Sequence, residues 1–370
     1  MSANSVAAKQ NEKKVAARGV FLLDPLTDPR WDSFVEKHPF GKISHTSSWK
    51  RVLEDSFANM KGYYLALEDQ SGTALKAALP LFERKGKLSG HRLVSIPHAT
   101  LCDPLVSSGE DLSALIDAAV SLQQQKRITS IEVRSLDAFP LLDDKRISRH
   151  KFLKNHYIDL DKSQEELFRS FHRTCVRQRI SRAENSDLRL VVGQDEMDLN
   201  LFFQLFVKTR KRLGFPPQPY RFFISLWQEF GATGKMSVLL AKRQQHILSG
   251  LILFKYRDRV SAEFLAWDAG CRDVSPNHFL FWEGIKAAHR EGYSIFDFGA
   301  TSPNNTTLME FKKHWGTKII DITHCYCPHQ ESDDYESKEL SVQYKLTKKI
   351  CPYIPDSVLI HLGSFFYNYL

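Results

Sequence analysis

The stretch 293–316 brings together the residue types that a reaction centre needs. It begins with a short apolar run that contains one carboxylate, Asp297, and it breaks at Gly299 into a polar turn over 301–305. It ends in an apolar and basic segment at helical spacing, which contains Lys312. A strand with a buried acid, a tight turn and a cationic helix suits a reaction centre, although an ordinary strand–turn–helix connection has the same local pattern.

Each charged residue of this stretch has a catalytic and a structural interpretation. Lys312, held beside the turn, suits the stabilisation of negative charge on a tetrahedral intermediate or a phosphate. The alternative for Lys312 is an exposed, solvated lysine, which is how lysines usually occur. Asp297 stands between two phenylalanines in a predicted strand. We therefore expect Asp297 to be buried and structural, and to order the turn over 301–305 through hydrogen bonds.

A second carboxylate, Glu263, is the single charge of the predicted strand 261–267. Strand alternation places Glu263 on the same face as Leu265 and Trp267. A carboxylate among apolar neighbours is expected to have a raised pKa, which suits a general base near neutral pH. A structural carboxylate that bonds a neighbouring strand or helix fits the pattern equally well.

Basic residues gather in two segments, and the formal net charge of the whole chain is +8. The segment 167–184 is predicted as one helix, on which Arg173 and Arg177 lie four residues apart on one face. A second cluster contains Arg210 and Arg212. Arginine rows of this kind bind phosphates or carboxylates, while a solvated basic face is the alternative for any one arginine. The charge favours an anionic partner such as a nucleotide, a nucleic acid, a polyanionic glycan or an acidic lipid.

Two further patterns bear on other classes of site. The run His324-Cys-Tyr-Cys-Pro-His329 has the composition of a metal cluster, but alternation sends Cys325 and Cys327 to one face, and no second cysteine pair stands at zinc spacing. We interpret these cysteines as core thiols on a strand and expect no metal. The chain has no Gly-x-Gly-x-x-Gly, P-loop or Gly-x-Ser-x-Gly motif, so the dinucleotide-binding, kinase and serine-hydrolase classes have no support.

The sequence contains no pattern for export or for crossing a membrane. Residues 1–19 are polar and basic, without an apolar signal core, and are predicted as a disordered tail. No stretch reaches the roughly 20 apolar residues that span a bilayer. The cytosol is therefore the expected location, with the inner face of the membrane as an alternative. The apolar end, 358–370, is predicted to dock on the protein body or to lie on a membrane surface.

The order of predicted elements repeats once along the chain. A hairpin, a third strand, a loop, an amphipathic helix, a short turn and a strand occur over 63–134 and again over 236–298. Residue identities hardly match, so a chance agreement of coarse patterns is the alternative to an internal duplication. We predict a mixed α/β fold of two tandem modules, with a tail over 1–19, domains over 20–150 and 151–330, and a linker with a terminal helix over 331–370.

The stretch 296–316 reads Phe-Asp-Phe-Gly, then Ser-Pro-Asn-Asn, and then Phe-Lys and Trp-Gly. This pattern resembles the Fem-like branch of the GNAT acyltransferases, which includes peptidoglycan-bridge aminoacyltransferases and CelD-type acyltransferases of exopolysaccharide and cellulose operons. The resemblance covers 20–330 and is strongest over 160–316. Further matches to the family are His45 with Trp49, the segment from Thr209 to Gly214, and Asn277 with Trp282.

The resemblance implies two GNAT-like modules and an enzyme that passes an acyl or aminoacyl group to an amine or similar nucleophile. It implies a part in the transfer step for the pair Phe311-Lys312. The arginine of the Thr-x-x-Arg segment, Arg212, is implied to contact substrate phosphates, with Arg210 as the alternative. The other positions that we assign to substrate binding are Arg173, Arg177, Asn277, Asn304 and Asn305, while Asp297 and Gly299 are assigned structural roles.

The donor is left open between acyl-CoA and aminoacyl-tRNA. The GNAT pyrophosphate loop, Arg/Gln-x-x-Gly-x-Gly/Ala, is expected between the strand that ends at Trp267 and the helix that begins at Pro276, but the chain has Asp-Ala-Gly-Cys-Arg-Asp-Val-Ser there. The N-terminus of that helix still offers amide groups to an anion. The long coiled-coil arm of some Fem-like enzymes is missing, which weakens transfer RNA as the donor.

Together these patterns predict an N- or O-acyltransferase that acts on a cell-envelope or exopolysaccharide precursor. The acceptor would attack a thioester or ester directly, with Glu263 accepting the proton and Lys312 stabilising the oxyanion. The alternative is a non-catalytic module whose arginine-rich helix holds RNA or an anionic glycan.

Overall fold

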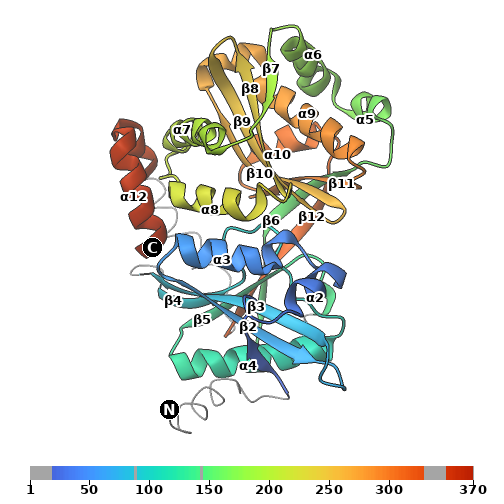
Figure 1. The fold of residues 1–370 in the computed structure, drawn as a ribbon, viewed down its shortest axis with the longest axis vertical. Coiled ribbons are helices and arrows are strands. Elements are labelled where there is room, and N and C mark those ends of the chain that lie inside the picture. The colour runs from blue at the N-terminus through green and yellow to red at the C-terminus, as the bar shows by residue number, and fades with distance from the viewer. Residues whose placement is uncertain (1–18, 87–89, 142–144, 329–346, 370) are drawn as a thin grey trace. The chain divides into compact units, whose positions relative to one another are not determined.

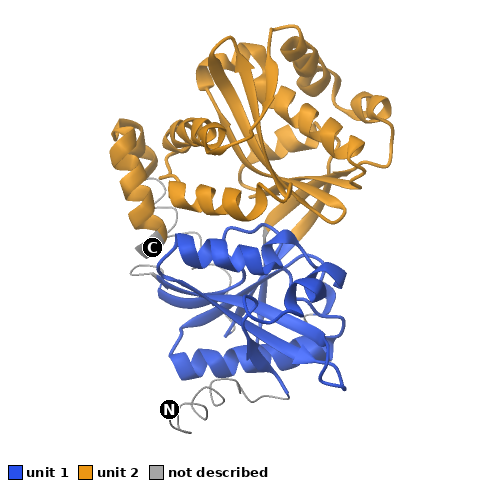
Figure 2. Cartoon of the chain, viewed as in Figure 1, with its two compact units in different colours: residues 1–152, 322–333, 368–370 blue, residues 153–321, 334–367 orange. Residues whose placement is uncertain are grey.

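The structure is a computed structural model, and it describes residues 19–86, 90–141, 145–328 and 347–369. The chain divides into two compact units, which Figure 2 colours separately. Unit 1 comprises 1–152, 322–333 and 368–370, and unit 2 comprises 153–321 and 334–367. The predicted tail, apart from its last residue, and the predicted linker lie outside the described residues. Within the described ranges, no helix is both long enough and apolar enough to cross a membrane.

Unit 1 is built on a mixed sheet with the strand order β1-β2-β3-β4-β5-β12 (Figure 1). Neighbouring strands are antiparallel except for the parallel pair β4 and β5. The elements of this unit are β1 (Phe21–Leu23), α2 (Trp31–Lys37), η1 (Ile43–His45), α3 (Ser47–Ser56), β2 (Met60–Glu68), β3 (Leu75–Gly86), β4 (Gly90–Val94), α4 (Gly109–Lys126), β5 (Ser130–Ser135), η2 (Phe139–Leu141) and the second half of β12 (Lys318–Cys327).

Unit 2 contains the strands β6-β11-β10-β9-β8-β7, in this order across the sheet, and among these neighbouring pairs only β10 and β11 are parallel. Its strands are the part of β6 (Ser148–Asp159) from residue 153 on, β7 (Arg189–Val192), β8 (Met236–Arg243), β9 (His246–Tyr256), β10 (Arg259–Trp267) and β11 (Ile295–Thr301). Its helices are α5 (Gln164–Ser170), η3 (Arg173–Arg177), α6 (Gln178–Glu184), α7 (Glu196–Leu213), α8 (Tyr220–Phe230), η4 (Ala269–Val274), α9 (Pro276–Arg290), α10 (Thr306–Lys313), η5 (Cys351–Tyr353) and α12 (Asp356–Tyr369).

Two long helices cover opposite faces of the sheet of unit 2. Gly250 of β9 lies against Phe202 of α7, whereas Leu253 of the same strand lies against Gly284 of α9. Residues an odd number of positions apart on a strand point to opposite faces. Both helices begin and end with local signals, such as Pro276 at the start of α9.

The predicted fold class, a mixed α/β fold of two tandem modules, is confirmed. The repeated order of elements that the sequence predicted did not include β6. It also did not predict that β12 pairs with β5. Among the described residues, unit 1 therefore takes up 322–328, a segment that the linear order had placed in the second domain. The predicted position of two cysteines on β12 is confirmed, because Cys325 and Cys327 both lie in the core of unit 1.

The prediction of one continuous helix over 167–184 is wrong. The chain forms α5, a π-helical turn (η3) and α6, with extended backbone at Phe171 and His172 between the first two. Phe171 turns inward and packs edge-on against Trp282 and Trp315, with ring centroids 5.7 and 5.1 Å away. The His172 N–H donates to His314 O at 2.9 Å. These tertiary contacts replace the hydrogen bonds that a continuous helix would make.

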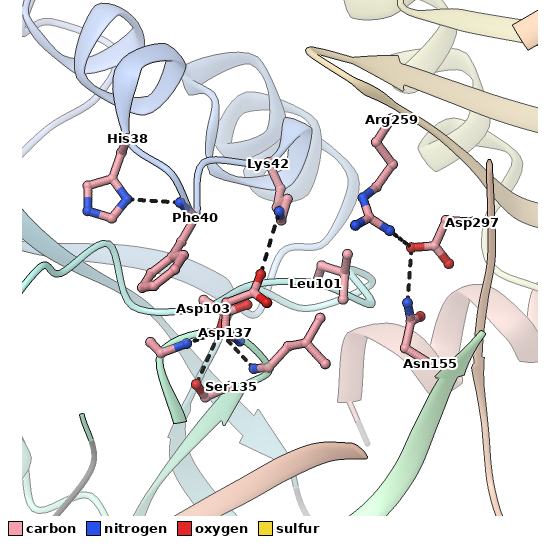
Figure 3. Close-up of polar contacts among 12 residues, drawn as sticks. His38, Phe40, Lys42, Leu101, Asp103, Ser135, Asp137, Asn155, Arg259 and Asp297 are labelled. Carbon is pink, nitrogen blue, oxygen red and sulfur yellow. Dashed lines mark hydrogen bonds and ion pairs between the residues drawn. The ribbon is translucent and has the colours of Figure 1, made fainter. Parts of the chain in front are cut away.

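One buried carboxylate, Asp103, fixes the turn that follows β5 in unit 1 (Figure 3). Its Oδ1 accepts hydrogen bonds from the N–H groups of Leu136, Asp137 and Ala138 at 2.7, 2.8 and 3.0 Å. The hydroxyl of Ser135 donates to the same oxygen at 3.1 Å. Consecutive N–H groups just beyond a strand need an acceptor when they are withdrawn from water, and Asp103 supplies it. Burial raises the pKa of this carboxyl.

Candidate active site

The candidate site lies in unit 2, where the parallel pairing of β10 and β11 stops. The last pair is Ser261 with Asp297. Just beyond it, β10 is irregular around Glu263 and β11 is irregular directly before Gly299. Gly299 has a φ angle of +74°, which a residue with a side chain adopts only with strain. Main-chain groups of the two strands therefore leave the regular hydrogen-bond pattern at neighbouring positions.

Asp297 fixes the main chain at this point, and Figure 3 shows its contacts with Arg259 and Asn155. Its Oδ1 accepts the Gly299 N–H at 2.7 Å, and its Oδ2 accepts bonds from Arg259 Nη1 at 2.6 Å and Asn155 Nδ2 at 3.1 Å. The residue is only 1% exposed, so Arg259 compensates for a charge that is withdrawn from water. These bonds hold the irregularity before Gly299, rather than the turn over 301–305 that the sequence pattern suggested.

Lys312 is buried, not solvated, and it lies against the same part of β11. Its Nζ donates to Gly299 O at 2.8 Å and to Ala300 O at 3.2 Å, and the residue is 5% exposed. Burial lowers the pKa of Lys312 to about 8, and the negative charges of Asp297 and Glu263 oppose this shift. The three residues whose charges the sequence singled out thus share one electrostatic neighbourhood.

Helix α10 and its surroundings hold Lys312 in place. Asn305 caps the helix, because its Oδ1 accepts the Leu308 N–H at 3.2 Å. Phe311 faces Trp315, with ring centroids 6.3 Å apart, and Trp315 is fully buried. In the structure Phe311 therefore anchors α10 by aromatic packing, and a direct part for it in catalysis stays a prediction.

Glu263 is half-buried at the irregularity of β10. Ala262 precedes Glu263 and Leu265 follows it, and both pack against the core of unit 2. In a regular strand, residues three positions apart point to opposite faces. Simple alternation, from which the face of Glu263 was predicted, therefore does not apply to this part of the strand. The role of Glu263 as a general base stays a prediction.

His156 was missed by sequence reasoning. It lies on β6 opposite Gly299, fully buried, with Nε2 3.3 Å from Met309 Sδ and Nδ1 3.1 Å from Thr317 Oγ1. Burial lowers the pKa of His156 to about 4, and the charge of Lys312 acts in the same direction. His156 is therefore neutral near pH 7. No local signal identified it, because β6 itself was not predicted and the residue belongs to no motif.

A second cationic feature lies at the end of β10, around Trp267. The Arg212 guanidinium lies over the Trp267 ring, 4.5 Å from its centroid, and Nη1 donates to Trp267 O at 3.1 Å. Arg272 lies over the same ring at 5.3 Å. Thr209 Oγ1 accepts the Trp267 N–H at 2.9 Å, so both ends of the Thr-x-x-Arg segment bind this residue. Burial and the charge of Arg272 lower the pKa of Arg212. Two neighbouring guanidinium groups suit an anion such as a diphosphate.

Other predicted binding residues make structural contacts. Arg210 Nη2 donates to Tyr367 Oη at 3.2 Å, and Asn277 Oδ1 accepts the Ser249 hydroxyl at 2.7 Å. Asn304 is exposed in the turn before α10. Substrate binding by these residues and by Asn305 stays a prediction.

The loop between β10 and α9 is not arranged as an open cradle for phosphates. It folds into η4, in which the Gly270 N–H donates to Asp268 Oδ1 at 2.8 Å and the Cys271 N–H donates to Asp268 O at 3.2 Å. Ser275, which directly precedes α9, has a φ angle of +53° and makes no side-chain cap bond. Amide groups that a pyrophosphate would need are thus engaged within the loop.

The arginines predicted to share a helix face lie on the π-helical turn η3. Arg173 is exposed and Arg177 is half-buried. Beside them the donor atoms of His172, Cys175 and His314 lie within 4.8 Å of one another, close enough to hold a metal ion. However, His172 Nδ1 already accepts the Cys175 N–H at 3.2 Å, which places the ring proton on Nε2. A metal ion would have to break this bond, so we assign none here.

A cavity of about 670 Å³ opens in unit 2 between α7, the β8–β9 turn and the loop after β10. Its walls include the polar side chains of Gln204, Lys208, Arg243, His246 and Asp268. Two permanent cations against one carboxylate favour a polar or anionic occupant.

The sequence is similar to one domain family and to several known proteins. Residues 170–313 match the acetyltransferase (GNAT) domain family. The chain is 22% identical to a lipid II:glycine glycyltransferase of Staphylococcus aureus (strain USA300), over 80% of this chain and 90% of that protein. It is also 22% identical to the UDP-N-acetylmuramoylpentapeptide-lysine N(6)-alanyltransferase of Weissella viridescens, over 79% of this chain and 90% of that protein.

Solved structures share the fold. FemX superposes with a TM-score of 0.66 and 18% identity, over 80% of this chain and 94% of that chain. L-PGS from Bacillus licheniformis superposes with a TM-score of 0.54 and 14% identity, over 88% of this chain and 98% of that chain. A tandem GNAT protein from the clavulanic acid pathway gives a TM-score of 0.51, with 11% identity, over 85% of this chain and 99% of that chain.

Replacing Asp297 by alanine should destabilise unit 2, because Arg259, whose side chain is only 14% exposed, would remain as a charge without its partner. We expect the free energy of unfolding to fall by about 3–5 kcal/mol. Denaturant unfolding followed by circular dichroism measures the loss. The double variant Asp297→Ala/Arg259→Met removes the unpaired charge and should recover part of the stability. A double variant that loses as much as the two single variants together would contradict the assignment.

Proposed function

We propose that this chain, a distant member of the FemX-like branch of the GNAT superfamily, transfers an aminoacyl group from an aminoacyl-tRNA to an amino group of a peptidoglycan precursor. The observation that carries the proposal is Lys312, a buried amine held against two carbonyl groups where β10 and β11 cease to pair. Burial of a lysine is costly, and a pKa brought toward neutrality by burial beside two carboxylates is typical of functional sites.

The reaction is the aminolysis of an ester. The acceptor nitrogen attacks the carbonyl carbon of the aminoacyl ester, and the carbonyl oxygen becomes an oxyanion. The tetrahedral intermediate then collapses with cleavage of the bond to the ribose oxygen. A proton leaves the attacking nitrogen and ends on that ribose oxygen. One C–N bond forms and one C–O bond breaks, so no oxidant or reductant is required.

Lys312 is assigned to the oxyanion. Its two hydrogen bonds to Gly299 O and Ala300 O orient the ammonium group and leave one N–H for a further acceptor. With a pKa of about 8, the ammonium form still dominates at pH 7. Its charge acts in a place withdrawn from water, where electrostatic stabilisation is strong. Glu263 is assigned to carry the proton from the attacking nitrogen to the ribose oxygen, directly or through water.

Two observations favour aminoacyl-tRNA over acyl-CoA as the donor. The loop before α9 uses amide groups internally, at Gly270 and Cys271, where a GNAT pyrophosphate loop would present them. The relatives that match most of the chain are named for glycyl and alanyl transfer. The same names favour a peptidoglycan precursor over an exopolysaccharide precursor. A diphosphate on such a precursor suits the paired Arg212 and Arg272 beside Trp267.

Replacing Lys312 by methionine should lower kcat by about 100- to 1000-fold and change KM little, because the lost interaction exists only in the transition state. Transfer of a labelled amino acid from charged tRNA to a nucleotide-linked pentapeptide measures both constants. Lys313→Met is the matched control, since the neighbouring lysine is exposed and pairs with Glu310 on the surface. Full turnover by the Lys312 variant would remove this residue from the mechanism. No transfer by the unaltered chain, with salt-dependent RNA binding, would favour the non-catalytic module.

The value of kcat/KM should fall as the pH rises above about 8, because Lys312 then loses its proton and can no longer neutralise the oxyanion. Lys312→Arg keeps its positive charge at higher pH. In this variant the decline of kcat/KM should therefore begin at a higher pH. Rates measured across the pH range with both proteins test the assignment. A decline that stays at the same pH in the arginine variant would mean that another group titrates there.

Replacing Arg212 by alanine should raise KM for a diphosphate-bearing acceptor by about 10- to 100-fold, because a charge-assisted contact is lost. For an acceptor peptide without the diphosphate, the same variant should have the KM of the unaltered chain. Arg182→Ala, a change at an exposed arginine on α6, is the control. Equal effects of Arg212→Ala on both acceptors would show a structural role through Trp267 instead.

A further inference from the structure

One side of the terminal helix α12 is attached to unit 2. Asp356 forms an ion pair with Lys211 of α7 at 2.8 Å. Gly363 lies so close to the loop after α7 that an added Cβ would be 2.1 Å from Pro217 O. Leu359, on the same side of the helix, is fully buried. The helix is therefore held against the last turn of α7 and the loop that follows it, and both belong to unit 2.

The other side of α12 is apolar and exposed. Val358, Leu362 and Phe365 are 47%, 43% and 54% exposed, and their spacing puts them on one face of the helix. Before the helix, Ile350 and Tyr353 are also exposed. These five are a large share of the thirteen large hydrophobic residues that are exposed in the described part of the chain. A concentration of this kind marks a contact surface, whereas single exposed hydrophobic residues do not.

The exposed charged residues that directly precede this surface are positive. Lys348 and Lys349 precede it and are exposed. The single acidic residue of 347–369, Asp356, is already neutralised by Lys211. An apolar helix face that follows exposed lysines is an arrangement that binds the interface of an anionic membrane.

We propose that this face of α12, together with Ile350 and Tyr353, binds the surface of an anionic lipid bilayer and presents the chain to a lipid-linked acceptor. The helix is about 21 Å long, which is too short to span the membrane and fits a position in the plane of the head groups. The acceptor part of the proposal rests on the proposed function. The last turn of α7 carries both Lys211, which holds α12, and Arg212, which we assigned to the diphosphate. A lipid-linked diphosphate lies at head-group depth, where this turn would meet it.

The test is a sedimentation assay with two kinds of vesicle, phosphatidylcholine alone and equal parts phosphatidylcholine and phosphatidylglycerol. The full chain should bind the mixed vesicles, and added salt should weaken the binding. Leu362→Asp should lower the affinity about tenfold or more, because it places a charge in the apolar contact. Met197→Asp is the matched control, since Met197 is 72% exposed on α7 and lies outside this surface; it should bind as the unaltered chain does.

Thermal unfolding should be unchanged in both variants, because both positions are exposed. Absence of vesicle binding by the unaltered chain, or equal binding by Leu362→Asp, would overturn the proposal. Dissociation of an oligomer by Leu362→Asp, without an effect on vesicle binding, would overturn it in favour of a contact between copies of the chain. The vesicle assay contains neither donor nor acceptor, so its result is independent of whether the proposed aminoacyl transfer is correct.

Discussion

The candidate site depends on the buried ion pair between Asp297 and Arg259, whose atoms approach to 2.6 Å. Arg259 opens β10 and Asp297 closes the short parallel pairing with β11, so the pair fastens the two strands together just before their pairing ends. The same carboxylate accepts the N–H of Gly299, whose left-handed backbone takes it out of the regular pattern. With the chain held in this shape, the carbonyl groups of Gly299 and Ala300 both face Lys312. An apolar contact at position 297 would leave that N–H without an acceptor.

Charge balance explains how a lysine can remain buried here. The carboxylates of Asp297 and Glu263 and the cations of Arg259 and Lys312 form a neutral set within one part of unit 2. His156 adds no charge near pH 7, because burial and the nearby ammonium group hold its pKa at about 4. The ammonium group of Lys312 keeps one N–H beyond the two that it donates to carbonyl groups, and an oxyanion requires such a donor.

The last turn of α7 connects the second cationic feature with the terminal helix. Arg212 lies over Trp267, while the preceding residue, Lys211, pairs with Asp356 of α12. Gly214 ends the helix with a φ angle of +83°, and an added Cβ would lie 2.5 Å from the main chain of Lys348. The arginine assigned to a diphosphate and the helix assigned to a lipid surface are thus both positioned by contacts of the last turn of α7. A change in this turn is expected to affect both.

The sequence by itself determined the features that depend on local spacing. The strand–turn–helix over 293–316, the start of α9 at Pro276, the repeated order of elements and the inward face of Cys325 and Cys327 all follow from sequence patterns. Only the tertiary structure decided the rest, because the deciding partners are distant in sequence. Asn155 lies 142 residues from the Asp297 that it contacts, His156 reaches the site from a strand without a clear pattern, and Phe171 breaks its helix to meet Trp282 and Trp315. The irregularities at Glu263 and Gly299 likewise arise from strand pairing, which no local pattern specifies, and they are what turn a connection between two elements into a candidate site.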